Sequence, residues 1–191
     1  SNANSASVSV ISTATGEVDN TFINVGNSPR EMFIPPGSGL LLVSNFGGVD
    51  IGADKVAAVD YETGLIVQIT VGDKPLGMAA TPDGRYAFVA NSGSGSVSLI
   101  SVAALTEVLK ISVGQGPTAC AVTPDNSQVY VVNSLTRTIS IIDIQSKTVV
   151  ETIPNVGTEP FDIAFYERAA DELFALVTDR ALGRVWVFQV R

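Results

Sequence analysis

Two carboxylates in one glycine-rich segment are the clearest candidates for ligand chemistry in this sequence. Asp50 and Asp54 lie within residues 45–54, where the backbone adds further carbonyl oxygens. Oxygen ligands suit calcium, but the segment does not match the 12-residue loop of calcium-binding helix pairs. We therefore predict no metal site, and Asp50 and Asp54 are only a weak candidate pair for calcium. Because loops often carry binding residues, we also predict that these two aspartates bind a ligand. The alternative is that residues 45–54 form a plain surface loop.

The chain contains no histidine, which removes most metal-ligand sets and every pairing of histidine with a serine or cysteine nucleophile. Paired carboxylates remain conceivable for other chemistry, but Asp83 and Asp125 stand at equivalent turn positions, where capping the turn explains them. The sequence also lacks the Gly-Lys of a phosphate-binding loop and a Gly-x-Gly-x-x-Gly segment. We therefore predict a protein that is not an enzyme and has no cofactor.

Charge and hydropathy limit the partners. Nineteen acidic residues against eleven basic ones give a net charge of −8, so the surface would repel a phosphate backbone, and we predict no nucleic-acid partner. No apolar run approaches the roughly 20 residues that a membrane helix requires, and we predict no membrane insertion. The single cysteine, Cys120, stands in an apolar run and is predicted to be a core residue of a strand.

The elements that must position the candidate residues follow a repeat. The segment Val-Gly-x-x-Pro occurs four times, with its glycine at positions 26, 72, 114 and 157. A period of roughly 40–45 residues built from short apolar runs is typical of a β-propeller blade. Residues 73–114 show one unit, in which an apolar run, a Thr-Pro-Asp-Gly turn and a run ending at Asn91 precede two further strands.

We therefore predict an all-β fold, a β-propeller of four-stranded antiparallel blades with about four blades in this chain. The predicted boundaries are a remnant of an expression tag at 1–3 and a single repeat domain at 4–191, divided into a partial blade at 7–26, blades at 27–72, 73–114 and 115–157, and a partial blade at 158–190.

The order of the strands raises the question of how the ring closes. The strands predicted at residues 8–11 and 185–188 both read as third strands, and they would compete for one place if the chain closed on itself. This favours an incomplete or half propeller, either paired in a homodimer that completes a ring or belonging to a longer chain. A closed four-bladed ring is the alternative. Open edges tend to pair with another chain.

The first strand of each blade is expected to begin at the central channel. The residues at this position are Arg30, Leu76, Thr118 and Phe161, which differ in kind and so fit a channel without one ligand common to all blades. We predict Arg30 and Asp162 as ligand-binding residues at the channel rim.

The sequence resembles the YVTN family of β-propeller repeats. The resemblance rests on the strand ends at residues 130–133 (Tyr-Val-Val-Asn) and 88–91 (Phe-Val-Ala-Asn), and on the turns at 81–84 and 123–126. The family occurs in surface-layer and other exported microbial proteins. The resemblance therefore implies an extracellular, cell-surface or periplasmic protein. Together with the repeat, the acidic surface and the missing catalytic residue types lead us to expect a non-catalytic module that binds a protein or glycan partner.

Two other functions remain open, because propellers host many unrelated activities. The fold also resembles the propellers of sugar-lactone hydrolases, which would make Arg30 and Asp162 catalytic candidates. A structural role, as one repeat array of a surface layer, is the third alternative.

Overall fold

The computed structural model describes residues 1–47, 54–169 and 172–190. Within these ranges the chain forms five antiparallel sheets and no helix, so they contain no helix that could cross a membrane. The three middle sheets have four strands each, which confirms the predicted fold of four-stranded blades.

We name the sheets in chain order. The N-terminal hairpin consists of β1 (Ser7–Ile11) and β2 (Val18–Ile23); blade 1 of β3 (Pro29–Phe33), β4 (Leu40–Asn45), β5 (Lys55–Asp60) and β6 (Ile66–Thr70); blade 2 of β7 (Pro75–Ala80), β8 (Tyr86–Asn91), β9 (Ser96–Ser101) and β10 (Thr106–Ser112); blade 3 of β11 (Pro117–Val122), β12 (Gln128–Asn133), β13 (Thr138–Asp143) and β14 (Thr148–Ile153); and the C-terminal sheet of β15 (Pro160–Ala169), β16 (Glu172–Asp179) and β17 (Arg184–Gln189).

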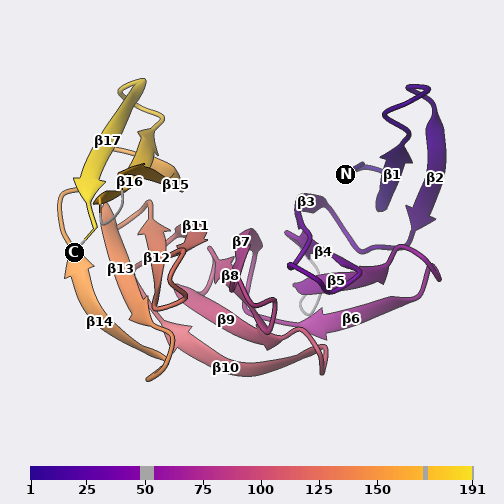
Figure 1. The fold of residues 1–191 in the computed structure, drawn as a ribbon, viewed down its shortest axis with the longest axis horizontal. Coiled ribbons are helices and arrows are strands. Elements are labelled where there is room, and N and C mark those ends of the chain that lie inside the picture. Colours follow the sequence, from indigo (N-terminus) through magenta and orange to yellow (C-terminus); the bar gives the residue numbers. More distant parts are fainter. Residues whose placement is uncertain (48–53, 170–171, 191) are drawn as a thin grey trace.

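The five sheets stand side by side in an open arc (Figure 1). The first strands β3, β7, β11 and β15 lie toward the concave side, and the fourth strands β6, β10 and β14 form the convex rim. The N-terminal hairpin and the C-terminal sheet lie at the two separate tips of the arc. The chain is therefore an incomplete propeller, and the alternative of a closed four-bladed ring is wrong for this structure.

Apolar side chains between neighbouring sheets hold the arc together. Successive residues of a strand point to opposite faces, so each middle strand serves two junctions. On β9, Val97 and Leu99 pack toward blade 3, whereas Ile100 packs toward blade 1. One buried layer of this kind lies at each junction, and most residues of β5, β9 and β13 are buried as a result.

The turns between the first and second strands use their aspartates as the sequence predicts. The hydroxyl of Thr81 donates to Asp83 Oδ1 at 2.6 Å, and the backbone N–H of Arg85 donates to the same oxygen at 3.0 Å. Thr123 and Asp125 repeat the first contact in blade 3. These hydrogen bonds, led by those of the threonines, hold the pKa of both carboxyls below its usual value. The turn role of Asp83 and Asp125 is confirmed.

Candidate functional site

A cleft of about 510 Å³ opens where the first strands of four sheets begin. All four of the residues predicted to approach the channel line it. The lining residues are Arg30, Glu31, Phe46, Leu76, Gly77, Thr118, Ala119, Phe161 and Asp162. The cleft therefore draws on β3, β7, β11 and β15, which are far apart in the sequence.

A repeated irregularity of the first strands presents these residues to the cleft. Each first strand begins with a proline paired to the last residue of its second strand, and the register then shifts. In blade 1 the shift falls between Pro29 and Met32, and in the C-terminal sheet between Pro160 and Ile163. Irregularities of this kind bend a strand and redirect its side chains, as β-bulges do. Residues 30–31 and 161–162 lie within these two shifts.

Two carboxyls enter the cleft from opposite ends of the sequence. Glu31 keeps an exposed side chain at the cleft, but the protein groups around its carboxyl remove part of its hydration and so raise its pKa; a hydrogen bond from the backbone of Met78 opposes this effect, and the negative charge of Asp162 reinforces it. Asp162 is exposed, and its Oδ1 accepts a hydrogen bond from the N–H of Ile163 at 2.8 Å. Both residues line the same cleft, so β3 and β15 bring the two acids to one site.

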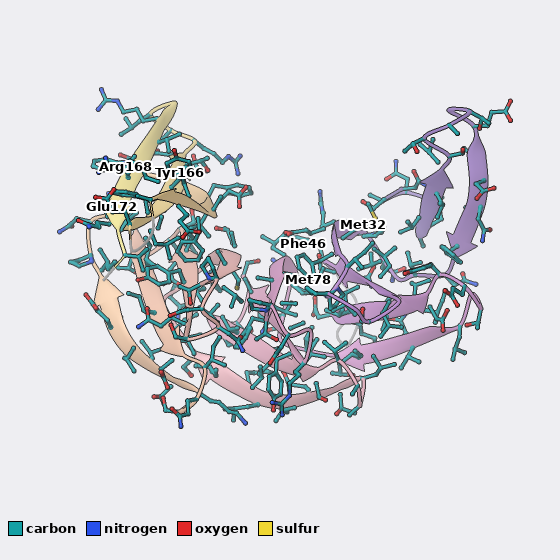
Figure 2. The ribbon with its side chains drawn as sticks, in the orientation of Figure 1. Met32, Phe46, Met78, Tyr166, Arg168 and Glu172 are labelled. Atoms are coloured by element: carbon teal, nitrogen blue, oxygen red, sulfur yellow. The ribbon has the colours of Figure 1, made fainter. Side chains whose placement is uncertain are left out.

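The aromatic rings of the cleft are covered by cations. The guanidinium carbon of Arg30 lies 5.1 Å from the ring centroid of Phe46, and Lys74 Nζ lies 5.9 Å from the same centroid. Arg180 lies 4.4 Å from the ring centroid of Phe161. Figure 2 shows Phe46 on the concave side of the arc. Both rings thus engage in cation–π contacts, each stabilising by about 0.5–1 kcal/mol where exposed.

The floor of the cleft joins blade 3 to the C-terminal sheet. The hydroxyl of Thr118 donates to the backbone carbonyl of Phe161 at 2.6 Å. Behind Thr118, Cys120 is buried, as predicted. Burial, reinforced by the charge of Glu31, raises the pKa of the Cys120 thiol far above its usual value. The thiol is therefore protonated at neutral pH and unsuited to nucleophilic chemistry.

The candidate calcium pair does not contribute to the described cleft. Asp50 lies outside the described residues. Asp54 is half-buried, and its Oδ1 accepts the backbone N–H of Lys74 at 2.9 Å, a contact that anchors the start of blade 2. The described ranges hold no group of three or more Cys, Asp or Glu side chains placed to bind a metal ion. Of the predicted ligand residues, the structure brings together Arg30 and Asp162 and leaves Asp54 apart from them.

Glu31 and Phe46 line the cleft although the sequence analysis did not select them. Glu31 is the second residue after Pro29, and Asp162 is the second residue after Pro160. Comparing this position between the repeats would have shown that both residues are acidic and belong to the same site. Phe46 follows β4 and is brought to the cleft by the pairing of Pro29 with Asn45. Nothing in the repeat marks it.

The arc and its cleft define a β-propeller repeat protein. The sequence model of YNCE-like β-propellers matches residues 74–179, more than half of the chain. The chain therefore belongs to the YNCE-like β-propeller family.

Comparison with solved and curated proteins extends this result. Among solved structures, hydrazine synthase of Kuenenia stuttgartiensis matches with a TM-score of 0.65 and 25% sequence identity. The match covers 85% of this chain and 49% of the hydrazine synthase chain, so this chain spans about half the length of that structure. No curated protein matches the sequence. The propeller class is established, and the more specific resemblance to YVTN repeats stays a prediction.

Proposed function

We propose that this chain is a non-catalytic β-propeller module that binds a protein partner by receiving a basic side chain in the cleft at its inner strands. The observation that carries this proposal is the convergence of Glu31 and Asp162 on one open cleft. A guanidinium or ammonium group placed there would relieve the repulsion between the two carboxylates and form charge-assisted hydrogen bonds. The net charge of −8 favours the approach of a basic segment.

The two aromatic rings at the cleft already contact cationic side chains, which favours a protein partner over a glycan partner. Sugar-binding sites commonly offer a free aromatic face on which a sugar ring stacks. In this cleft, Phe46 and Phe161 already contact Arg30, Lys74 and Arg180. A glycan would have to displace those cations, whereas a basic side chain finds its acidic partners accessible.

A short peptide with one basic side chain tests the proposal. The probe is Gly-Gly-Arg-Gly-Gly with blocked ends, and its matched control carries citrulline, which has the same shape without the charge. We expect saturable changes in the amide NMR signals of Leu76 and Phe161 with the arginine peptide only. Glu31→Gln should weaken binding more than about fivefold, or roughly 1 kcal/mol, whereas Glu62→Gln, the same change at an exposed turn residue, should leave it intact.

Either of two results would overturn the proposal. Equal affinity for the arginine and citrulline peptides would remove charge recognition from the site. Equal effects of Glu31→Gln and Glu62→Gln would show that only the overall charge of the protein matters.

A second candidate function is lactone hydrolysis, which the resemblance to sugar-lactone hydrolases suggests. One observation favours it: the pKa of Glu31 is raised by the partial loss of its hydration and by Asp162, and perturbed carboxyls of this kind cluster at active sites. Arg30→Ala and Asp162→Asn should then abolish hydrolysis of a sugar lactone without lowering the unfolding midpoint. Turnover that is unchanged in both variants would exclude the cleft as a catalytic site.

The resemblance to YVTN repeats supports placing this module at a cell surface or in the periplasm. In that setting the same arc could also serve as one repeat array of a surface layer, the structural alternative. The two roles differ in their partners, since a surface-layer array associates laterally with copies of itself and a receptor module does not.

A further inference from the structure

A surface pocket of about 590 Å³ lies between the turns of blades 1 and 2. Its lining includes Leu40, Asp83, Gly84, Arg85, Val102 and Leu105. The pocket is separate from the cleft at the inner strands, because β7 begins beside the cleft at Leu76 and Gly77 and ends before the turn that carries Asp83. All of its lining residues belong to two blades that each have four strands.

The next junction along the arc shows how the corresponding space is bridged between blades 2 and 3. The N–H groups of Ser38, Gly84 and Asn126 each donate to the carbonyl three residues earlier, so these residues occupy one position of the turn. Between blades 2 and 3, Asn126 Nδ2 donates to Asp83 Oδ2 at 3.3 Å and joins the two turns. Between blades 1 and 2 the matching residues are Gly84 and Gly37, which have no side chains to form this contact.

An aromatic ring makes a second difference between the two junctions. β4 begins at Leu40 and β8 at Tyr86, in each case two residues after the matched turn position. Tyr86 packs against the apolar layer between blades 2 and 3, and Lys147 Nζ lies 5.7 Å from its ring centroid. Leu40 packs against the layer between blades 1 and 2 but carries no ring. The pocket therefore lies where the next junction holds a phenol ring.

The floor of the pocket is apolar, and one of its residues has a strained backbone. Val102 is buried, and Leu40 and Leu105 pack half-buried on the same layer. The φ of Leu105 is +53°, in the left-handed region that a branched aliphatic residue rarely adopts. The matching residue of blade 1 is Gly64, because both N–H groups donate to the carbonyl four residues earlier. A leucine at this position extends the apolar floor although its backbone is strained, and such strain is common at ligand-binding sites.

The polar side chains of the pocket have partners in the described structure, with one exception. Both oxygens of Asp83 accept hydrogen bonds, and the hydroxyls of Ser38 and Ser101 bond to backbone groups. The exception is the guanidinium of Arg85, which has no hydrogen bond or ion pair within the described ranges and lies 5.6 Å from the ring centroid of Tyr86. The pocket therefore offers an apolar floor and one cation, and a cation attracts the negative face of an aromatic ring.

We propose that this pocket binds a ligand through a phenol-type ring. The ring lies against Leu40, Val102 and Leu105, in the way that the ring of Tyr86 lies against blade 3, and the guanidinium of Arg85 is close to its face. The volume of the pocket falls within the range of small-ligand sites. The ring can belong to a small phenolic molecule or to a tyrosine side chain of another protein. This site is independent of the receptor role proposed for the cleft.

The first probe is p-cresol, which is the tyrosine side chain without its backbone. Titration into the intact chain should give saturable shifts in the methyl NMR signals of Leu40, Val102 and Leu105. The matched control is 4-methylcyclohexanol, which has the same substituents on a ring that is neither flat nor aromatic. It should bind at least about fivefold more weakly. The absence of saturable shifts with p-cresol, or equal affinity for the two compounds, would overturn the proposal.

A peptide with blocked ends, Gly-Gly-Tyr-Gly-Gly, distinguishes the two sources of the ring. If it binds at least as tightly as p-cresol, the ligand is a tyrosine side chain of a protein. If it binds more weakly than p-cresol or not at all, the ligand is a small phenolic molecule. Both results support the phenol ring as the group that the pocket recognises.

Two protein variants locate the ring. Leu40→Tyr copies Tyr86 and should fill the pocket from within, so that p-cresol no longer binds to the folded chain. Leu105→Asn keeps a residue that tolerates positive φ but removes apolar surface, and it should weaken binding more than about fivefold. Leu135→Asn, at a leucine that is 76% exposed in another loop, is the matched control and should bind normally.

The variants also define the results that would contradict the site. Normal binding of p-cresol by folded Leu40→Tyr would overturn the proposal. Equal effects of Leu105→Asn and Leu135→Asn would do the same. The urea midpoint of each variant shows whether it is folded, and if Leu40→Tyr does not fold, the comparison of the two asparagine variants decides the matter.

Discussion

The carboxylate of Asp179 accepts a hydrogen bond from the indole Nε1–H of Trp186, at 3.3 Å. Asp179 ends β16 at the position that Asn45, Asn91 and Asn133 occupy in blades 1 to 3. Its two oxygens also accept backbone N–H groups of residues 158, 159, 181 and 182. The three asparagines instead donate through Nδ2, and their buried Oδ1 atoms have no partner among the described residues. Asp179 therefore uses both of its side-chain oxygens as acceptors for the loops beside its strand, whereas each asparagine leaves its Oδ1 without a partner among the described residues.

Asp179→Asn should lower the urea midpoint of unfolding, because an amide nitrogen would replace an oxygen that faces N–H donors. Burial alone would raise the pKa of Asp179, but the hydrogen bonds from Thr158, Glu159, Trp186 and Leu182 together lower it below its usual value. A lowered pKa in the folded state means that the carboxylate stabilises the fold above the unfolded-state pKa of about 4 and that this contribution is lost as the pH falls through the lower folded value.

Urea unfolding at several pH values, followed by Trp186 fluorescence, checks this prediction. The midpoint of the variant should depend less on pH below about pH 4 than that of the native chain. Asp19→Asn, at an exposed position of β2, is the control. An Asp179→Asn midpoint equal to that of the control at neutral pH would contradict the assigned role.

Thr118→Val removes one hydrogen bond between sheets at nearly constant volume. The Thr118 hydroxyl donates to the Phe161 carbonyl at 2.6 Å across the junction between blade 3 and the C-terminal sheet. Its loss should lower the free energy of unfolding by about 1 kcal/mol. Chemical denaturation measures this quantity, with Thr106→Val at an exposed strand end as the matched change. If the two variants were equally stable, the contact would not contribute to the junction.

Gly77→Ala should be among the most destabilising single-methyl additions at the cleft. A Cβ at Gly77 would lie 2.4 Å from the carbonyl oxygen of Thr118 and 2.6 Å from the Cα of Ala119, so β7 and β11 would have to separate. Overpacking of this kind costs about 1–3 kcal/mol. Gly64→Ala is the comparison. A Cβ at Gly64 would meet its nearest atom only at 3.9 Å, but the residue has a φ of +76°. Its loss of stability therefore measures the strain of the backbone without a steric clash. A Gly77→Ala variant as stable as the native chain would show that the inner strands are not closely packed.

The Cys120 thiol should resist modification in the folded chain. It is buried, and its pKa lies far above the usual value, so reaction with a thiol reagent requires the structure to open. The labelling rate at neutral pH should fall at least about a hundredfold below that of the urea-unfolded chain, which corresponds to roughly 2.7 kcal/mol of opening free energy. Rapid stoichiometric labelling without denaturant would contradict the placement of Cys120 in the layer between blades 2 and 3.

The repeat carried most of what could be predicted about the fold. Short apolar runs, the Thr-Pro-Asp turns and Val-Gly-x-x-Pro segments are local signals, and local signals determine where strands begin and end. The strand predicted at residues 185–188 is β17 (Arg184–Gln189) for this reason. Closure of the ring depends on how successive sheets are oriented, which no local segment encodes, so the choice between an arc and a ring needed the structure.

The candidate site also combines residues that the local repeat could predict with residues that only the arrangement of the sheets reveals. Arg30 and Asp162 could be placed at the channel because they follow the conserved spacing of the repeat within this chain. Glu31 was missed because the sequence analysis selected only the first residue after Pro29, whereas the register shift after this proline brings the first two to the cleft. Asp54 was selected for its loop composition, and its structural role, accepting the N–H of Lys74, depends on a contact between blades that composition does not reveal.

The most direct test of the proposed receptor role is the titration of the Glu31 side chain by carbon-detected NMR, with and without the arginine peptide. In the free chain the pKa of Glu31 should lie above its usual value, because of the partial loss of its hydration and the charge of Asp162. A bound guanidinium stabilises the carboxylate, so the arginine peptide should lower this pKa and the citrulline peptide should not. Identical titration curves with both peptides would contradict the claim that the cleft receives a basic side chain.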